Sequence, residues 1–277
     1  MKKWYAVIGN PIGHSMLPFM HNSWFSQMEI DATYIPIQVI EEDLDRAVSS
    51  MNLLGISGFN VTIPHKEKII PLLDILDPMA EKMGAVNTVV RLEDGRLKGF
   101  NTDGLGFVRS LEEVVGDQLK SEEVLIIGAG GAARGIAFAL ETLGYSHLTI
   151  CNRTVEKAGA ICSELEQKAA AISLQQASEQ LNQFKIIIQT TPAGLKNGDF
   201  SLPFSIEKLN STAIVADIVY NPLMTPFLEA ASQKGATTVS GLGMFVHQGA
   251  LAFNYWTGQS PDLLAVKKQL IENLGGN

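Results

Sequence analysis

Cysteine is scarce in this chain, which has only Cys151 and Cys162 among its 277 residues. The two are not arranged as a CxxC pair, and no cluster of histidines accompanies them. Neither a disulfide framework nor a zinc site is therefore expected, and no other metal site is predicted. Such sparing use of cysteine is typical of a reducing compartment, so we expect a cytoplasmic protein.

The chain also lacks an excess of positive charge and any long apolar run. Lys and Arg number 21 against 29 Asp and Glu, which gives a net charge of -8. A negative net charge does not attract phosphate backbones or anionic lipids, so neither nucleic acid nor a membrane is an expected partner. No run of about 18 apolar residues exists, and the apolar stretch after Lys2 and Lys3 is too short for a signal peptide. An anionic cofactor would have to be bound by local donors.

What the sequence does contain is a regular alternation of short apolar runs with stretches of helix length, and its length suffices for two domains. This pattern is typical of an α/β protein with parallel sheets and helices on their faces. We predict helices that begin near Pro18, near Glu41 and after Asp103, and two final helices over 244–256 and 262–273. The predicted strands are 4–8, 33–38, 56–60, 86–91, 96–100, 124–127, 148–151, 186–189, 213–217 and 237–239.

Two local signals divide the chain. Asp94 and Gly95 lie between two β-type runs, and an Asp-Gly pair predicts a hairpin because both positions tolerate positive φ; the first sheet is therefore mixed. The polar stretch 116–123 precedes a new apolar run that starts a second sheet. We place the boundary near Asp103, with residues 1–103 in the first domain and 104–243 in the second. The residues alone do not assign the last two helices to either domain.

A nucleotide-binding signal follows the strand predicted at 124–127. The sequence GAGGAA at 128–133 leads directly into a helix-forming stretch, which is the GxGxxA dinucleotide fingerprint in its strand, turn and helix context. Gly128 permits the tight turn, Gly130 lets a pyrophosphate approach the backbone, and Ala133 allows close packing of helix and strand. Amides at the start of the helix then bind the phosphates. The predicted contacts here are Gly128, Ala129, Gly130, Gly131 and Ala132.

The next strand indicates which nucleotide is preferred. In NAD enzymes it usually ends in an acidic residue that binds the ribose hydroxyls, whereas here it is followed by Asn152, Arg153 and Thr154. No carboxylate is present to repel a 2′-phosphate, and Arg153 can pair with that phosphate while Asn152, Thr154 and Lys157 add donors. The predicted cofactor is NADP. The alternative is that Arg153 is an ordinary solvated arginine at a helix start.

Polar residues also gather where other strands are predicted to end, which is where ligand sites form in α/β proteins. Among them Lys66 and Asp103 suit the reduction of a ketone, because an ammonium can protonate the developing alkoxide while a carboxylate orients it. By spacing alone the signal is weak. Lys66 could be a surface lysine, and Asp103 could be only a helix N-cap.

A set of motifs in consistent order resembles the signatures of the shikimate dehydrogenase family. The set covers nearly the whole chain and consists of GNPIGHS at 9–15, NVTIPHK at 60–66, GAVNT at 84–88, NTDG at 101–104, GAGGA at 128–132, NRT at 152–154, YNPL at 220–223, GLGM at 241–244 and QGA at 248–250. The resemblance implies an N-terminal open α/β substrate domain and a Rossmann-type NADP-binding domain. It also implies that the final helices, 244–277, complete the first domain.

The resemblance further assigns roles to individual residues. Lys66 would be the catalytic acid and base, and Asp103 its partner at the substrate hydroxyls. Ser15 would hold the substrate carboxylate. The remaining substrate contacts would be Thr62, Asn87, Tyr220 and Gln248, and Ile218 and Gly241 would contact the cofactor. His14 and His65 lie inside motifs, but backbone or packing roles fit them at least as well as proton transfer.

Position 17 departs from the family pattern. The first motif usually continues as His-Ser-x-Ser-Pro, with both serines directed at the carboxylate, whereas this chain has Leu17 before Pro18. If Leu17 lines the substrate pocket, carboxylate binding is weakened or the preferred substrate differs. The alternative is a variation that is compensated elsewhere.

The expected function is NADPH-dependent reduction of 3-dehydroshikimate to shikimate, in the route to aromatic amino acids, by a monomer or homodimer. Two alternatives stay open. A quinate or shikimate dehydrogenase paralogue would more often accept NAD, which Arg153 disfavours. A non-catalytic NADP-binding sensor would have lost turnover, against which Lys66 and Asp103 argue.

Overall fold

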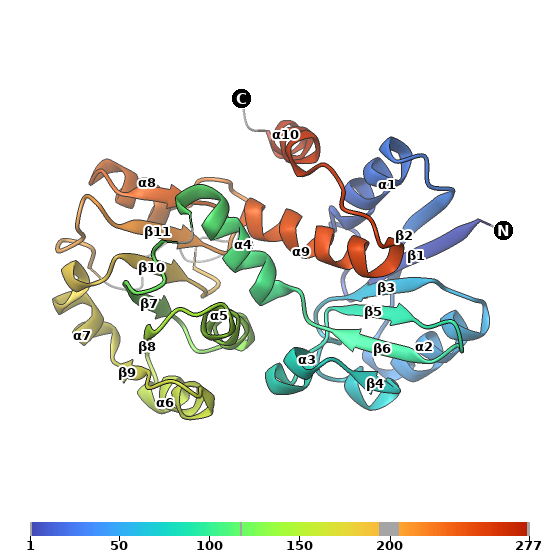
Figure 1. Cartoon of the computed structure of the whole chain (residues 1–277), viewed down its shortest axis with the longest axis horizontal. Coiled ribbons are helices and arrows are strands. Elements are labelled where there is room, and N and C mark those ends of the chain that lie inside the picture. Colours follow the sequence, from blue (N-terminus) through green and yellow to red (C-terminus); the bar gives the residue numbers. More distant parts are fainter. Residues whose placement is uncertain (1, 117, 194–204, 276–277) are drawn as a thin grey trace. The chain divides into compact units, whose positions relative to one another are not determined.

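The computed structural model describes residues 2–116, 118–193 and 205–275. They form two compact units (Figure 1). Unit 1 comprises the chain up to Thr102 together with Gln248–Leu270, and unit 2 comprises Asp103–His247 and the residues that follow Leu270. Within the described ranges, no helix is both long enough and apolar enough to cross a membrane.

The described part of unit 1 contains one six-stranded sheet of mixed direction, as predicted. Its strands lie in the order β2-β1-β3-β5-β6-β4. β1 runs parallel to β2 and β3, whereas β5 is antiparallel to both β3 and β6. The strands are β1 (Lys3–Gly9), β2 (Ala32–Gln38), β3 (Gly58–Val61), β4 (Ile75–Leu76), β5 (Thr88–Arg91) and β6 (Leu97–Phe100).

The predicted hairpin joins β5 to β6, but its turn differs from the expected one. Gly95 has φ 86°, whereas Asp94 is not among the positive-φ residues. Asp94 contributes instead through its carboxylate, whose Oδ1 accepts the backbone N–H of Arg96 at 3.1 Å. Because the side chain caps the turn, only one residue needs the left-handed conformation.

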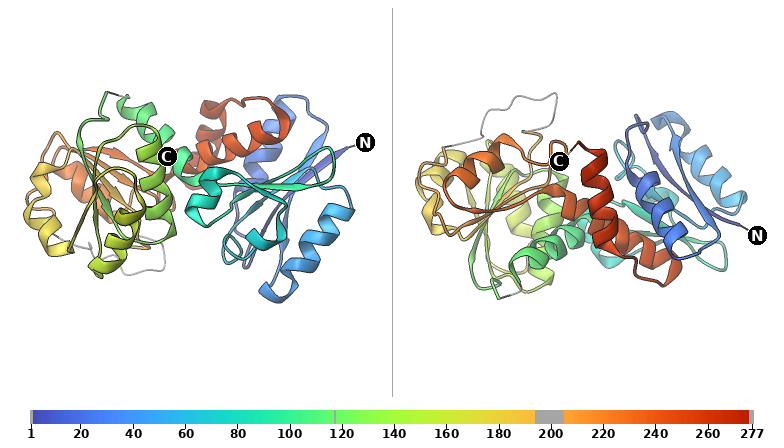
Figure 2. Two further views of the ribbon diagram at one scale, coloured as in Figure 1. Left: turned by 60° about the horizontal axis from the view of Figure 1, so that its bottom comes forward. Right: turned by 90° about the horizontal axis from the view of Figure 1, so that it is seen from above.

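Helices cover both faces of the unit 1 sheet (Figure 2). The helices that contribute to this unit are α1 (Leu17–Gln27), α2 (Leu44–Leu53), α3 (Pro78–Met83), the later part of α9 (Gly241–Thr257) and most of α10 (Leu263–Asn273). Side chains alternate along β1, so Ala6 and Ile8 pack in one cluster with buried residues of α2. Tyr5 points to the other face, where its ring lies 5.2 Å from that of Phe25 and 5.0 Å from that of Trp256. The helix predicted to begin near Glu41 starts instead at Leu44, after a short 3₁₀ turn.

The described part of unit 2 contains a six-stranded sheet that is parallel throughout. Its order, read from the β9 edge, is β9-β8-β7-β10-β11-β12, which is 3-2-1-4-5-6 when β7 to β12 are numbered 1 to 6 in chain order. This is the Rossmann arrangement, and the α/β fold prediction is confirmed. The strands are β7 (Glu123–Ile127), β8 (His147–Cys151), β9 (Ala170–Ile172), β10 (Ile186–Gln189), β11 (Ile214–Asp217) and β12 (Thr237–Val239).

The four central strands of unit 2, β7, β8, β10 and β11, are buried on both faces, which explains their nearly continuous apolar sequences. Leu125, Ile187 and Val215 face a cluster that includes buried residues of α7 and α8. Close backbone contact joins α4 to α5, since a Cβ on Gly104 would lie 2.2 Å from the carbonyl oxygen of Gly135. The helices are α4 (Asp103–Val115), α5 (Gly131–Thr142), α6 (Val155–Glu164), α7 (Leu174–Glu179) and α8 (Pro226–Gln233). Gly104 thus fixes the first turn of α4, where Asp103 lies.

Candidate active site

Four of the predicted substrate and catalytic residues belong to one edge of the unit 1 sheet. Because β5 is antiparallel to both neighbours, its amino end lies beside the carboxyl ends of β3 and β6, and β1 runs parallel to β3. The connections that leave the carboxyl ends of β1 and β3 carry Ser15, Thr62 and Lys66, and Asn87 directly precedes β5. The topology therefore gathers these residues although up to 72 positions separate them in the sequence.

A buried hydrogen-bond network fixes Asn87. Its Oδ1 accepts the backbone N–H of Thr102 at 2.9 Å and the hydroxyl of Thr88 at 3.0 Å, while its Nδ2 donates to the Thr102 hydroxyl at 2.9 Å. Thr102 is completely buried and Asn87 is 3% exposed. Since Asp103 is the next residue after Thr102 and the first of α4, the same network fixes the backbone that leads to Asp103.

Asn60 extends this network toward β2. Its Oδ1 accepts the Tyr34 hydroxyl at 2.7 Å, and its Nδ2 donates to the carbonyl oxygen of Asn87 at 3.1 Å. Burial raises the pKa of Tyr34 well above its usual range, so the phenol stays a donor. We did not predict Asn60 or Thr102 as site residues, although both lie within the motifs at 60–66 and 101–104.

Ser15 and Leu17 lie at the amino end of α1. The Ser15 hydroxyl oxygen accepts the backbone N–H of Leu17 at 3.3 Å, which leaves the hydroxyl proton available to donate to a ligand. Leu17 is 8% exposed, and Met20, His21 and Trp24 follow it at helical spacing on the buried face of α1. Leu17 therefore packs with the core face of the helix, and its place in a carboxylate pocket stays a prediction.

The loop after β3 is tied to neighbouring strands through its backbone. The N–H of Thr62 donates to the carbonyl of Ile8 at 3.0 Å, and the N–H of Val86 donates to the carbonyl of Lys66 at 2.8 Å. Thr62 and Lys66 are both half-buried. Lys66 is thus held at its main chain while part of its side chain is accessible.

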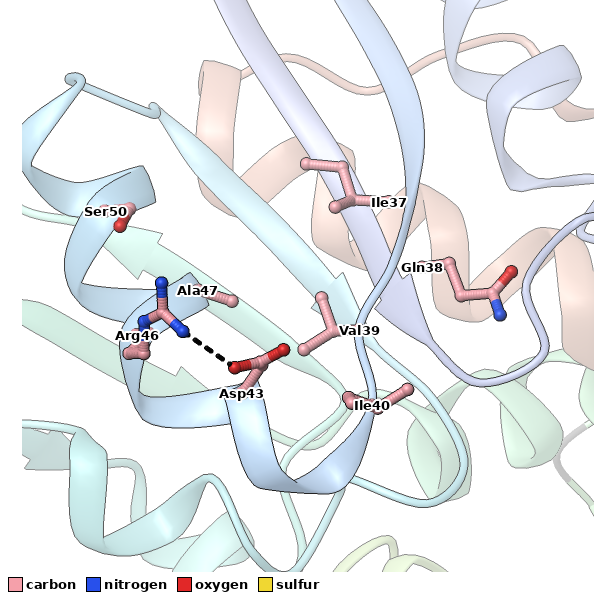
Figure 3. Close-up of a pocket in the computed structure, with 8 residues that line it drawn as sticks. All are labelled: Ile37, Gln38, Val39, Ile40, Asp43, Arg46, Ala47 and Ser50. Atoms are coloured by element: carbon pink, nitrogen blue, oxygen red, sulfur yellow. Dashed lines mark hydrogen bonds and ion pairs between the residues drawn. The ribbon is translucent and has the colours of Figure 1, made fainter.

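A separate hollow lies beside β2 and α2 in unit 1 (Figure 3). Its volume is about 580 Å³, and its lining consists of Ile37, Gln38, Val39, Ile40, Asp43, Arg46, Ala47 and Ser50. The charged pair on its wall, Arg46 and Asp43, is joined at 3.2 Å, with the Arg46 side chain 85% exposed. None of the predicted substrate residues lines it, so we do not include it in the candidate active site.

In unit 2, Gly128 lies at the topological switch point between β7 and β10. Its φ is 110°, and a Cβ here would lie 2.6 Å from the Thr190 hydroxyl. Gly130 and Gly131, at the start of α5, are exposed and would have no atom within 4 Å of an added Cβ. Ala133 is completely buried against the sheet. The turn is therefore open where a pyrophosphate would approach and packed where helix meets strand, as the fingerprint requires.

The residues after β8 form an exposed group of donors. Asn152 is half-buried, and its Nδ2 donates to the carbonyl of Thr154 at 2.9 Å. Arg153, Thr154 and Lys157 are mostly accessible. Within the described ranges, no carboxylate forms an ion pair with Arg153 or Lys157. Both cations are thus available to a phosphate, and the residues present fit the 2′-phosphate of NADP.

A buried carboxylate closes the loop between β11 and α8, because it is hydrogen-bonded to residues at both ends of that loop. Asp217, completely buried, accepts the N–H of Val219 at 3.0 Å through Oδ1 and the hydroxyl of Thr225 at 2.7 Å through Oδ2. Burial raises the pKa of this carboxyl to about 6, and the two hydrogen bonds oppose the shift. We did not predict Asp217 as a site residue, although a carboxylate at the end of an apolar strand could have indicated one.

The loop that Asp217 closes carries Ile218 and Tyr220. A Cβ on Gly241 would lie 2.1 Å from the carbonyl oxygen of Ile218, so only glycine permits this approach. The ring of Tyr220 stacks on that of Phe245 with centroids 4.8 Å apart, and burial raises the pKa of Tyr220, which keeps the phenol protonated. Gln248, 7% exposed, begins the unit 1 part of α9. Among the residues described, no three His, Cys, Asp or Glu side chains are grouped as a metal site would need.

Comparison with known proteins gives matches along most of the chain. The family described as "Shikimate dehydrogenase substrate binding domain" matches residues 7–89, "Shikimate / quinate 5-dehydrogenase" matches 110–196 and "Shikimate 5'-dehydrogenase C-terminal domain" matches 241–271. A curated relative, the shikimate dehydrogenase (NADP(+)) of Lysinibacillus sphaericus, is 61% identical over 277 residues, with 100% of each chain covered.

Solved structures agree in fold over nearly the full length. A shikimate dehydrogenase in complex with NADP⁺ superimposes with a TM-score of 0.90 at 39% identity, covering 99% of this chain and 96% of that one. The shikimate dehydrogenase of Thermus thermophilus in complex with NADP(H) and shikimate gives 0.86 at 34% identity, covering 96% and 97%.

Proposed function

Since the chain belongs to the shikimate dehydrogenase family, we propose that it catalyses the reversible NADPH-dependent reduction of 3-dehydroshikimate to shikimate, a step of aromatic amino acid biosynthesis. The observation that carries this proposal is the 61% identity, over the whole length of both chains, to an NADP-dependent shikimate dehydrogenase. Such a reaction needs a proton donor, a cofactor site and a site for an anionic substrate.

Lys66 is the proton donor in this proposal. Its ammonium protonates the ketone oxygen as negative charge develops there, and it takes the proton back in the reverse direction. Asp103 accepts a hydrogen bond from a neighbouring substrate hydroxyl and orients the ammonium. The main-chain bond from Val86 to Lys66 and the Asn87–Thr102 network that leads to Asp103 support both placements.

The remaining substrate contacts are neutral donors and acceptors. The Ser15 hydroxyl donates to the carboxylate, because its oxygen already accepts the N–H of Leu17. The phenol of Tyr220 donates as well, since the raised pKa keeps it protonated. The further contacts in the proposal are Thr62, Asn87, Gln248 and, at the edge of the carboxylate pocket, Leu17.

NADPH, when bound, would supply the hydride for the reduction, and NADP⁺ would accept it in the reverse direction. We assign its pyrophosphate to the turn and helix start at 128–132 and its 2′-phosphate to Arg153, with Asn152, Thr154 and Lys157 as further donors. Ile218 and Gly241 are assigned as further cofactor contacts. The open space at Gly130 and Gly131 and the unpaired state of Arg153 among the described residues support this assignment.

We further propose that the protein acts on small molecules in the cytoplasm as a monomer or homodimer, without nucleic acid. The scarcity of cysteine supports the cytoplasmic location, and the net charge of -8 supports the absence of nucleic acid as a partner.

The test is an assay of purified protein at 340 nm with shikimate or quinate, each with NADP or NAD. We expect reduction of NADP by shikimate to be the fastest of the four reactions. Faster turnover of quinate with NAD would instead identify a quinate dehydrogenase, and cofactor binding without turnover of any pair would identify a sensor.

A further inference from the structure

The residue before Lys66 is a histidine whose ring reaches a different strand. His65 is completely buried, and its Nε2 lies 2.7 Å from the carbonyl oxygen of Val39, which follows β2. A carbonyl oxygen can only accept a hydrogen bond, so Nε2 carries a proton and donates it. We infer that His65 is a positioning residue, which sets the place of Lys66 by tying its loop to the end of β2. The inference rests on the proposed role of Lys66.

The loop from Thr62 to Ile69 has attachments to three elements, and the ring of His65 makes one of them. Backbone bonds tie Thr62 to β1 through Ile8 and tie Lys66 to the segment before β5 through Val86. Within the loop, the N–H of His65 donates to the carbonyl of Thr62 at 2.9 Å, and its carbonyl accepts from Ile69 at 3.0 Å. The His65 ring makes the buried tie to the segment after β2, and an exposed ion pair between Lys68 and Glu41 reaches the same segment. Loss of the ring bond would leave the backbone attachments and this exposed pair, which contributes little, and would remove the buried support next to Lys66.

The receiving end of this bond is itself fixed. The N–H of Val39 donates to the carbonyl of Gly9 at 3.1 Å, and Val39 is 4% exposed. Val39 also lines the hollow beside β2 and α2 (Figure 3). Loss of the ring donor would leave a buried carbonyl without this partner, and such a group tends to shift until it finds another.

A shift of this loop would act on the rate rather than on cofactor binding. Lys66 must reach the ketone oxygen within hydrogen-bond distance, and a misplacement of about 1 Å can lower the rate about 100-fold. The nucleotide fingerprint lies in unit 2, whereas every residue of this network lies in unit 1. A positioning role therefore predicts a fall in kcat with little change in the KM for NADP.

Glutamine and methionine provide a matched pair of substitutions at position 65. The amide nitrogen of glutamine lies as many bonds from Cβ as Nε2 of histidine and can donate to the Val39 carbonyl. Methionine has the same length and no donor. His65→Gln and His65→Met therefore differ in the hydrogen bond while filling similar space. A control is His147→Met in unit 2, because the ring of His147 also lies near a carbonyl oxygen, that of Ser121 at 3.0 Å, but is exposed.

The experiment measures kcat, the KM for shikimate and NADP, and the pH profile of kcat for the wild type and these three variants. We expect His65→Met to lower kcat about tenfold to 100-fold, with the KM for NADP within twofold of the wild type and an altered pH profile. His65→Gln should recover most of the lost kcat and the wild-type profile. His147→Met should match the wild type.

The inference would be overturned if His65→Met kept a kcat within twofold of the wild type, or if His65→Gln were as impaired as His65→Met. It would also be overturned if the KM for NADP of His65→Met rose by as large a factor as its kcat fell, because this would indicate a general structural role. An inactive wild type would overturn the proposed function instead. If the variants prove unstable, urea unfolding followed by tryptophan fluorescence gives the folded fraction, by which kcat is corrected. An effect that vanishes on correction also overturns the inference.

Discussion

His21 makes the stability of unit 1 sensitive to acid. Its ring is completely buried, stacks on Tyr34 with centroids 4.5 Å apart, and has no hydrogen-bond partner for either nitrogen within the described structure. Burial lowers the pKa of His21 to about 3, because the charged ring would lose its hydration in this aromatic surrounding. In the unfolded chain the pKa of His21 is near 6.5, so below this pH the unfolded chain binds a proton that the folded chain does not bind.

The size of the effect follows from the two pKa values. Between about pH 6.5 and pH 3 the unfolded state binds one more proton, so stability falls as the pH falls, by about 1.4 kcal/mol per pH unit. From pH 7 to pH 5 the loss from His21 is about 2 kcal/mol. Since urea m-values are about 1 to 3 kcal/mol per molar, the urea midpoint of the wild type should fall by about 1 M from this group alone.

The three tryptophans, Trp4, Trp24 and Trp256, all belong to unit 1, so their fluorescence follows the unfolding of that unit. The assay compares urea unfolding of the wild type and His21→Phe at pH 7 and pH 5. The phenyl ring keeps the stack and cannot take a proton. Repacking adds a constant difference that cancels between the two pH values. We expect the wild type to lose about 2 kcal/mol more than the variant. An equal loss in both proteins would refute the reasoning.

The remaining predictions concern other parts of the molecule. Arg153→Ala should raise the KM for NADP at least about tenfold more than that for NAD, because a charge-assisted phosphate contact worth about 1.5 to 3 kcal/mol is lost with only one cofactor. Steady-state kinetics with each cofactor measures this, and equal changes would mean that Arg153 does not recognise the 2′-phosphate. Leu17→Ser should lower the KM for shikimate about tenfold or more if residue 17 lines the carboxylate pocket, and it should also lower the unfolding free energy, because Leu17 is 8% exposed. Unchanged kinetics with reduced stability would leave Leu17 a core residue only. Asp217, whose pKa is raised to about 6, should stabilise the fold by about 1 kcal/mol as the pH falls from 7 to 5, since the folded state then holds a proton that the unfolded state lacks. Unfolding of Asp217→Asn followed by circular dichroism should lack this gain, and a variant that keeps it would contradict the assignment.

Local patterns predicted the elements that are long or carry a strong motif. The apolar run at 124–127 and the GAGGAA turn predicted the start of the second sheet, and β7 with Gly128 lies there. β4 was missed because its two residues are too few to show any alternation. β9 was missed because two of its three residues are alanines, which are depleted in strands, whereas the equally short β12 consists of β-branched residues. Both missed strands are edge strands, each held by its neighbour rather than by its own pattern.

Residue roles that depend on distant partners could not be predicted from local sequence. Asn60 bonds to Tyr34, 26 positions away, and the ring of His65 reaches Val39 over the same separation. Only the folded topology, which places β2 and β3 on either side of β1, brings these groups together. Polar residues at strand ends are a local signal, so the motifs could predict Thr62, Lys66 and Asn87 at strand ends. The sheet topology then brings those strand ends to one edge of the sheet.

The central claim is that this chain reduces 3-dehydroshikimate with NADPH and that Lys66 supplies the proton. The most direct test follows the loss of NADPH at 340 nm with saturating 3-dehydroshikimate, for the wild type and Lys66→Ala, with NADPH binding measured in parallel. We predict turnover by the wild type and a kcat about 100-fold to 10,000-fold lower in the variant, with NADPH binding retained. No consumption of NADPH by the wild type, or a variant with more than half of the wild-type turnover, would contradict the account.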